Sequence, residues 1–245
     1  MCTACRQSAK HKVTNTNEII IKQNNTRLQN LSQTQTISPE QTELAQGMVR
    51  VNHLYRSALK MAVAQLEILD EEFETMYDHS PIHHIEYRIK TLESITEKLQ
   101  RRGLEVTIDN IYAHIQDVAG VRVICNYLDD IYYMRRLLTR TESFGIQRET
   151  DYIKEPKDTG YRSLHLILDV PIVISEGTLH LPVEVQLRTI AMDMWASLEH
   201  ELRYKSDRNF SDGDAARLRL CSEAISEIDR EMQRIYLGEK PEYEV

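Results

Sequence analysis

Three polar residues alternate with aliphatic residues in the stretch PVEVQLRT. In a strand, successive side chains point to opposite faces, so Glu184, Gln186 and Arg188 would share one face. The aliphatic face belongs in a core, and the polar face then presents a carboxylate, an amide and a guanidinium in a row. A solvent-exposed face of an antiparallel sheet is the plainer alternative. A sheet covered by helices on both faces would favour a functional role.

A second carboxylate, Asp117, lies in QDVAGVRV shortly before Gly120, and Arg122 follows. Proteins often hold Mg²⁺ with only one or two carboxylates, while phosphate oxygens and water complete the coordination. Asp117 and Glu184 together therefore make a candidate Mg²⁺ site. Spacing alone leaves open the alternative that Asp117 is a turn or cap residue.

The stretch DYIKEPKDTGYRSLH gathers cations around Gly160 and Tyr161 in a chain that is acidic overall. A tyrosine ring beside cations suits a purine diphosphate, because the base stacks and the phosphates pair with the cations. Taken singly, each cation is more typical of a solvated surface, and the ring is more typical of a core edge. Candidate phosphate or base ligands are Arg88, Lys90, Lys98, Arg122, Lys157 and His165.

Hydrophobic periodicity predicts the elements that must position these residues. A long helix is expected from Ser38, a cap followed by Pro39, to about Met76. Period-two alternation predicts a strand in HIEYRIK, with a short helix over 81–84 as an alternative start. The next helix is expected between a Thr91 cap and Gly103.

The second half of the chain alternates between predicted strands and helices. We expect a turn at Gly120, then a strand over 121–128, a helix over 129–138 and a strand over 145–153. Two long strands, 161–174 and 176–189, should meet at a turn containing Gly177. Helices are expected over 190–205 and 214–237. This order favours an α+β fold with a mixed sheet of about five strands flanked by helices.

Composition narrows the class of protein. The chain has 245 residues, 41% of them hydrophobic, and a net charge of −8, so any phosphate affinity must be local. No apolar run approaches a membrane span, and the N-terminus lacks the apolar core of a secretory signal. We therefore expect a cytoplasmic protein with reduced thiols.

The four cysteines and the polar start of the chain have plain interpretations. Residues 1–37 are rich in Asn, Gln, Thr and Ser and are expected to be disordered. Cys2 and Cys5 are expected to be thiols on this tail, because a metal or redox site needs more ligands or a folded context. Cys125 and Cys221 are expected in the core.

Five blocks in order, YRIKTLESITEKL, DVAGVRVI, DYIKEPKDTGYRSLH, PVEVQLRT and WASLEHELRYK, resemble the synthetase domain of the RelA/SpoT homologue family. With this length, the chain resembles the small alarmone synthetases, over roughly residues 45 to 235. The resemblance implies a nucleotidyltransferase fold of the polymerase β type, within a synthetase domain spanning 38–245. It also implies transfer of the ATP β,γ-pyrophosphate to the 3′-hydroxyl of GDP or GTP.

The same resemblance implies residue roles. Asp117 and Glu184 would hold Mg²⁺, with Glu184 near the acceptor hydroxyl as base. Arg88 and Arg122 would sandwich adenine, and Tyr161 would stack on guanine. Lysines Lys90, Lys98 and Lys157 would hold phosphates, and the remaining acceptor-side residues would be His165, Gln186 and Arg188.

The resemblance also implies assembly and control. Small synthetases are typically homotetramers, and the long terminal helices are expected to form the subunit contacts. We find no paired His-Asp motif of the hydrolase domain, so synthesis without hydrolysis is expected. Alarmone itself or RNA are candidate allosteric ligands.

Two other functions remain open at this stage. The same fold serves toxins that pyrophosphorylate the 3′ end of tRNA, for which Arg135, Arg136, Arg140 and Arg148 are candidate contacts. A non-catalytic RNA-binding regulator is the other. The net charge of −8 argues mildly against the toxin, and the two carboxylates with Tyr161 argue against the regulator.

Overall fold

The computed structural model describes residues 39–140, 143–204 and 210–238. The predicted disordered tail, the thiols of Cys2 and Cys5 and the predicted cap Ser38 lie outside these residues. The chain divides into two compact units, 1–47 and 48–245, and the sheet and the candidate site belong to the second.

A mixed five-stranded sheet forms the centre of the second unit, in the order β1-β2-β5-β4-β3. Strands β2 and β5 run parallel, and the other neighbours are antiparallel. This confirms the predicted mixed sheet. The strands are β1 (Ile82–Ile89), β2 (Ala119–Cys125), β3 (Gly145–Asp151), β4 (Leu164–Ile174) and β5 (Gly177–Thr189).

The helices follow the predicted order with one addition. The first runs from Pro39 to Met76, as the apolar periodicity indicated. The short α4, capped by Thr107, was not predicted, because seven residues carry too little periodicity. The helices are α2 (Pro39–Met76), α3 (Leu92–Arg101), α4 (Ile108–His114), α5 (Leu128–Arg140), α6 (Ile190–Tyr204) and α7 (Asp212–Leu237).

Several predicted boundaries were wrong for identifiable reasons. Gly120 is not a turn but lies inside β2, where it pairs with Arg88 and Glu184. The alternative helix at 81–84 does not form, because β1 begins at Ile82 and pairs with Cys125. The strand predicted over 121–128 ends at Cys125, since α5 begins at Leu128. The strand predicted from Tyr161 begins at Leu164.

The two cysteines in the described residues differ in burial. Cys125 lies fully buried on β2, as predicted. Cys221 is exposed on α7, so the prediction of a core position was wrong. Periodicity identified the helix but not which of its faces packs against the rest of the protein.

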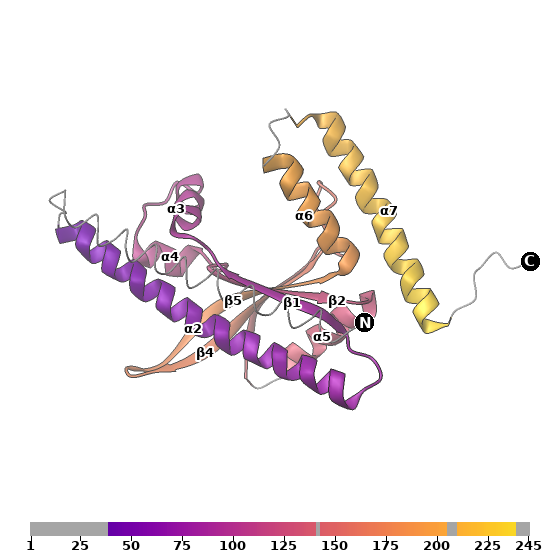
Figure 1. Cartoon of the computed structure of the whole chain (residues 1–245). Helices are drawn as coiled ribbons and strands as arrows, with labels where there is room; N and C mark the ends of the chain where they lie inside the picture. Colours follow the sequence, from indigo (N-terminus) through magenta and orange to yellow (C-terminus); the bar gives the residue numbers. More distant parts are fainter. Residues whose placement is uncertain (1–38, 141–142, 205–209, 239–245) are drawn as a thin grey trace, which may run out of the picture. The chain divides into compact units, whose positions relative to one another are not determined.

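The two faces of the sheet have different chemistry. Val121, Val123, Val185 and Leu187 are almost completely buried on one face, where helix α5 packs. Helix α6 lies over the opposite, polar face, since its Asp193 pairs with arginines of that face. Figure 1 shows α5 and α6 on opposite sides of the strands. The sheet is thus covered on both sides, which favours a functional role for its polar face.

Helix α7 packs against α6 and α5, and Figure 1 shows it beside α6. The Trp195 indole N–H on α6 donates to the Leu218 carbonyl at 2.9 Å. The Thr189 hydroxyl donates to Asp229 Oδ2 at 2.6 Å, and both residues are buried. These bonds fix α7 relative to the strand that carries the predicted site residues.

Within the described residues, no helix is both long enough and apolar enough to cross a bilayer.

The central strand should be sensitive to loss of packing. Leu187 is 0% exposed, whereas Val173 on β4 is 84% exposed. We expect Leu187→Ala to lower the free energy of unfolding by about 2–5 kcal/mol, because it leaves a cavity in the core. Val173→Ala should change it by less than about 0.5 kcal/mol. Urea denaturation of both variants checks this, and equal midpoints would contradict it.

Candidate active site

Strand register brings the predicted polar residues into neighbouring rows on one face of the sheet. In the first row, Arg88 on β1 and Glu184 on β5 flank Gly120. In the second row, Arg122 lies opposite Gln186, and Gln186 lies opposite His165 on β4. Gly120 and Glu184, like Arg122 and Gln186, are 64 positions apart in the chain and become neighbours only through strand pairing.

An open pocket lies over these rows. Five predicted residues line it, together with Glu86, Tyr87, Gly120 and Val121. Gly120 on β2 has no side chain, so the floor of the pocket between β1 and β5 stays open. The predicted residues in the lining are Arg88, Asp117, Arg122, Glu184 and Gln186.

Glu184 belongs to a closed ring of five hydrogen-bonded side chains. Its two oxygens contact His165 Nδ1 at 3.1 Å and Gln186 Nε2 at 2.7 Å. His165 Nε2 lies 2.7 Å from the Tyr161 hydroxyl. Arg188 Nη2 closes the ring by donating to Tyr161 at 2.6 Å and to Gln186 Oε1 at 2.7 Å.

One proton arrangement satisfies every bond in this ring. Arg188 can only donate, so the Tyr161 oxygen accepts from it and the Tyr161 O–H is left to donate to His165 Nε2. His165 Nδ1–H then donates to Glu184, which as a carboxylate can only accept. The donors therefore all lead toward the Glu184 carboxylate and stabilise its charge.

The pKa of Glu184 reflects two opposed effects. Burial alone would raise it, but the hydrogen bond and the electrostatic interaction with His165, together with the hydrogen bond from Gln186, outweigh burial. The net pKa lies below the ordinary glutamate value, so Glu184 is ionised at neutral pH. The negative charge of Asp117 acts in the other direction and raises this pKa, as expected for two carboxylates in one pocket.

Asp117 is held by two lysines. Lys90 and Lys98 both donate to its Oδ2, Lys98 at 2.8 Å. Burial would raise the pKa of Asp117, but the two ammonium groups outweigh burial and lower it. Burial is the main reason that the pKa of Lys90 lies below its usual value. The structure thus places the predicted phosphate ligands Lys90 and Lys98 against the predicted metal ligand.

The carboxylate chemistry fits a hard divalent cation. Asp117 Oδ1 is buried and makes no hydrogen bond, so its lone pairs remain available. Both carboxylates are ionised oxygen donors in one pocket. Among the described residues, no third Asp, Glu, His or Cys joins them as a metal ligand. A cation here would therefore take further ligands from substrate and water.

Arg122 stays charged beside other cations. Burial is the main reason that its pKa is lowered, and Arg188 and Arg88 lower it further. Its guanidinium lies 3.5 Å from Glu86 and 3.7 Å from Asp193. Arginine remains protonated even when its pKa falls somewhat, so the pocket keeps a planar cation.

The loop of residues 152–163, which is predicted to bind the acceptor and is called the acceptor loop below, contains Tyr161 and Lys157. Lys157 Nζ lies 4.8 Å from the centre of the Tyr161 ring and 4.6 Å from that of Tyr152. The Lys154 ammonium lies instead over Tyr132, 5.1 Å from its ring centre. The structure therefore brings Lys157, but not Lys154, to Tyr161.

Arg188 is largely internal. Its side chain is 4% exposed, and Nη1 pairs with Asp193 at 2.9 Å. Its guanidinium also lies 5.1 Å from the Tyr161 ring centre. The residue predicted on the acceptor side thus fixes Tyr161 and Gln186, and little of it faces solvent.

Sequence reasoning missed Asp193 and Tyr152. Asp193 lies in the first turn of α6, which begins directly after β5, so the helix turns it back over Arg188. The five-residue spacing from Arg188 to Asp193, across a strand that runs directly into a helix, could have indicated this pair. Tyr152 lies 5.2 Å from the His165 ring and 5.9 Å from the Tyr161 ring, in contacts that only the folded loop creates.

Comparisons with known proteins agree with this geometry. The family model described as "Region found in RelA / SpoT proteins" matches residues 87–209. GTP pyrophosphokinases YwaC and YjbM of Bacillus subtilis (strain 168) are 38% and 37% identical to this chain. The matches cover 73% and 74% of this chain and 85% and 84% of those proteins.

Solved structures give the same result for the fold. Small alarmone synthetase 1 from Bacillus subtilis, bound to its product pppGpp, matches with a TM-score of 0.70 at 36% identity, over 76% of this chain and 95% of that one. The same enzyme bound to AMPCPP matches with a TM-score of 0.63 at 33% identity, over 75% and 93%. The predicted α+β, nucleotidyltransferase-like fold is therefore confirmed. This chain belongs to the RelA/SpoT family, as a small alarmone synthetase.

Proposed function

We propose that this protein is a Mg²⁺-dependent pyrophosphokinase that uses ATP and either GDP or GTP to make ppGpp or pppGpp and AMP. One observation carries the proposal: two ionised carboxylates, Asp117 and Glu184, line one pocket together with the guanidinium groups of Arg88 and Arg122. The similarity to a GTP pyrophosphokinase, and to a small alarmone synthetase whose structures hold pppGpp and AMPCPP, supports it.

The donor nucleotide is assigned to the side of the pocket near β1 and β2. Arg88 and Arg122 provide two planar cations that suit the faces of adenine. Lys90 and Lys98, now on Asp117, would turn to the ATP phosphates when a divalent cation replaces them on the carboxylate. Such an exchange leaves each carboxylate, ammonium and phosphate group with a partner of opposite charge.

Asp117 and Glu184 would hold the Mg²⁺ ion. When bound, this ion supplies charge neutralisation for the phosphate oxygens during transfer. The buried, unbonded Oδ1 of Asp117 is the atom best placed to contribute.

The acceptor nucleotide is assigned to the loop that follows β3. Tyr161 would stack on guanine, and Lys157, beside its ring, would meet the phosphates. His165 and Gln186 line the path between this ring and Glu184. Because Arg188 and His165 fix the Tyr161 hydroxyl, the ring has its orientation before the acceptor binds.

Glu184 would act as the base. The acceptor 3′-oxygen forms a bond to the β-phosphorus of ATP, and the bond from that phosphorus to the AMP oxygen breaks with its electron pair. The hydroxyl proton passes to Glu184 as the new bond forms. Its lowered pKa keeps Glu184 in the ionised form that accepts a proton.

The proposed setting is the cytoplasm, with alarmone or RNA as candidate allosteric ligands. The tRNA alternative has lost part of its support. Of the arginines assigned to it, Arg135 is paired with Glu149 at 2.9 Å, and Arg136 lies over the Tyr133 ring. No observation favours tRNA over a guanosine acceptor.

One assay tests the reaction. With Mg²⁺ and ATP labelled in its terminal phosphates, the protein should transfer label to GDP or GTP and not to tRNA. Glu184→Gln and Asp117→Asn should each lower the rate by at least about 10²-fold, because they remove the base or a metal ligand.

The matched control is Glu176→Gln, since Glu176 is exposed and pairs with Arg50 away from the pocket. Circular dichroism should show all three variants folded. Full synthesis by both site variants would contradict the assignment. Labelled tRNA would support the toxin, and no transfer to any acceptor would support a regulator.

The pH profile should report the ring around Glu184. His165 opposes the effect of burial on Glu184, so His165→Ala should raise the pKa of Glu184. A base must be ionised, so the acidic limb of kcat/KM should move to higher pH in this variant. Rates from about pH 5 to about pH 9 measure the shift.

His180→Ala is the matched control, because His180 lies on β5, the strand that carries Glu184, but its ring bonds to Asp169 at 2.8 Å, outside the pocket. Its acidic limb should coincide with that of the unaltered protein. If the acidic limb of His165→Ala also coincides with that of the unaltered protein, His165 does not lower the pKa of the base.

Exposed apolar residues support the proposal of a homotetramer. On α6, a residue at every fourth position is exposed: Ile190 at 46%, Met194 at 51%, Leu198 at 52% and Leu202 at 46%. This spacing gives one continuous stripe along the helix. On α7, the exposed residues include Leu220, Ile228, Met232 and Ile235. Stripes of this kind are typical of subunit contacts.

Light scattering at micromolar concentration should show a homotetramer. Leu198→Glu should dissociate it, because a charge would be buried in the α6 contact. Val173→Glu, at an exposed position on β4, should leave the mass unchanged. A monomeric unaltered protein would refute the assembly.

A further inference from the structure

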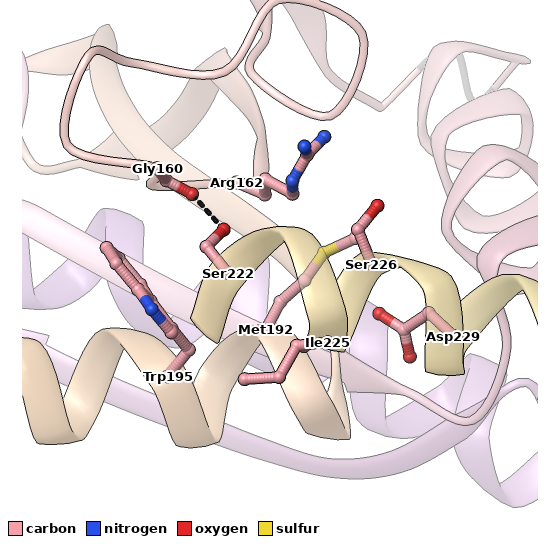
Figure 2. Close-up of a pocket in the computed structure, with 8 residues that line it drawn as sticks. All are labelled: Gly160, Arg162, Met192, Trp195, Ser222, Ile225, Ser226 and Asp229. Carbon is pink, nitrogen blue, oxygen red and sulfur yellow. Dashed lines mark hydrogen bonds between the residues drawn. The ribbon is translucent and has the colours of Figure 1, made fainter. Parts of the chain in front are cut away.

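A small cavity separates the acceptor loop from helices α6 and α7. Figure 2 shows Gly160 of the loop facing Ser222 of α7, with Trp195 of α6 at one end, and Arg162 and Ser226 also line the cavity. The cavity lies outside the pocket that holds the two carboxylates. It marks the place where α7 meets the loop that carries Tyr161.

Ser222 makes the direct link across this boundary. Its side chain is buried, and its hydroxyl donates to the Gly160 carbonyl at 2.5 Å, drawn as the dashed line in Figure 2. The two residues are 62 positions apart in the chain. Because the carbonyl is buried with it, losing the donor would leave a buried acceptor unsatisfied.

Gly160 allows the helix to approach closely. Its φ is +93°, a region that other residues rarely adopt. A Cβ at this position would lie 2.9 Å from the Ser222 Cβ and 3.3 Å from the Arg219 Cα. Helix α7 therefore packs on the bare backbone of the residue just before Tyr161.

The turn at Gly160 is tied to both predicted acceptor ligands. The Gly160 amide donates to the Lys157 carbonyl at 2.8 Å, and the Lys157 amide donates to the Tyr161 carbonyl at 3.2 Å. A shift of Gly160 would therefore displace Lys157 and Tyr161 together. The Tyr161 hydroxyl is fixed separately by Arg188.

Arg162, like Gly160, lies on the side of the loop that faces α7. Its side chain faces the cavity and α7, and it donates to the Ile153 carbonyl at 3.0 Å. Arg162 therefore points out of the site toward a helix. Tyr161 thus faces the site, while Gly160 and Arg162 on either side of it face α7.

We propose that Ser222 is a positioning residue for the acceptor nucleotide: through Gly160 it holds the acceptor loop so that Tyr161 and Lys157 are ordered before GDP or GTP binds. The inference rests on the proposed function in assigning the acceptor to Tyr161. Without the bond, ordering the loop becomes part of the cost of binding the acceptor. Only acceptor affinity should then fall, because Arg188 fixes the Tyr161 hydroxyl within the ring around Glu184, and Lys90 and Lys98 are held by Asp117.

Ser222→Ala tests this. We expect the KM for GDP or GTP to rise about 3- to 10-fold, with the KM for ATP and kcat at saturating acceptor unchanged. Hydrogen exchange should be faster at the amides of Lys157, Gly160 and Tyr161. A second variant, Gly160→Ala, should raise the same KM further, because its side chain meets Ser222.

Ser226→Ala is the matched control. Ser226 lies one turn along α7, lines the same cavity and is buried, but its hydroxyl contacts Arg230 at 3.3 Å and not the loop. Its kinetics and loop exchange should match those of the unaltered protein. The proposal is overturned when Ser222→Ala behaves like Ser226→Ala. It is also overturned when Ser222→Ala raises both KM values equally, which indicates a general loss of structure.

The exchange measurement separates this inference from the proposed function. When the unaltered protein makes no alarmone, the proposed function fails, yet faster exchange in Ser222→Ala would still show that the helix holds the loop. When alarmone is made and loop exchange does not change, only the role of Ser222 fails.

Discussion

The closed ring of hydrogen bonds around Glu184 is the interaction on which the candidate site depends. Its members come from the acceptor loop, β4 and β5, and each donor finds an acceptor only when these strands pair in one register. A one-residue slip would turn Glu184 and Gln186 to the apolar face. The core side of β5, with Val185 and Leu187 fully buried, prevents that slip. Packing on one face therefore fixes the chemistry of the other.

The ring and the Asp117 cluster hold charge in different ways. Hydrogen-bond donors surround Glu184, so it stays ionised while remaining available as a base. Ammonium groups neutralise Asp117, and a divalent cation with phosphates offers the same compensation. The two carboxylates are close enough to influence each other, and neither lies deep in the core. This arrangement suits a reaction in which negative charge gathers on phosphate oxygens.

Helix α7 connects parts that the sequence keeps far apart. It bonds to Thr189 at the end of β5 through Asp229 and to Gly160 in the acceptor loop through Ser222. The same helix carries exposed apolar residues on another face. A subunit packed on that face would contact the same helix whose Ser222 bonds to the acceptor loop. Assembly and acceptor binding would then be linked by one rigid element.

The sequence by itself determined the long helices and the strands, the polar face of β5 and five residues of the pocket, because alternation with period two and helical spacing are local properties. It also carried the resemblance, through five ordered blocks. Only the tertiary structure decided that Gly120 lies within a strand and that Cys221 faces solvent. It likewise placed Lys90 and Lys98 on Asp117 and made Arg188 internal. These features depend on which residue lies across a strand pair or beneath a helix, and local patterns contain no information about such partners.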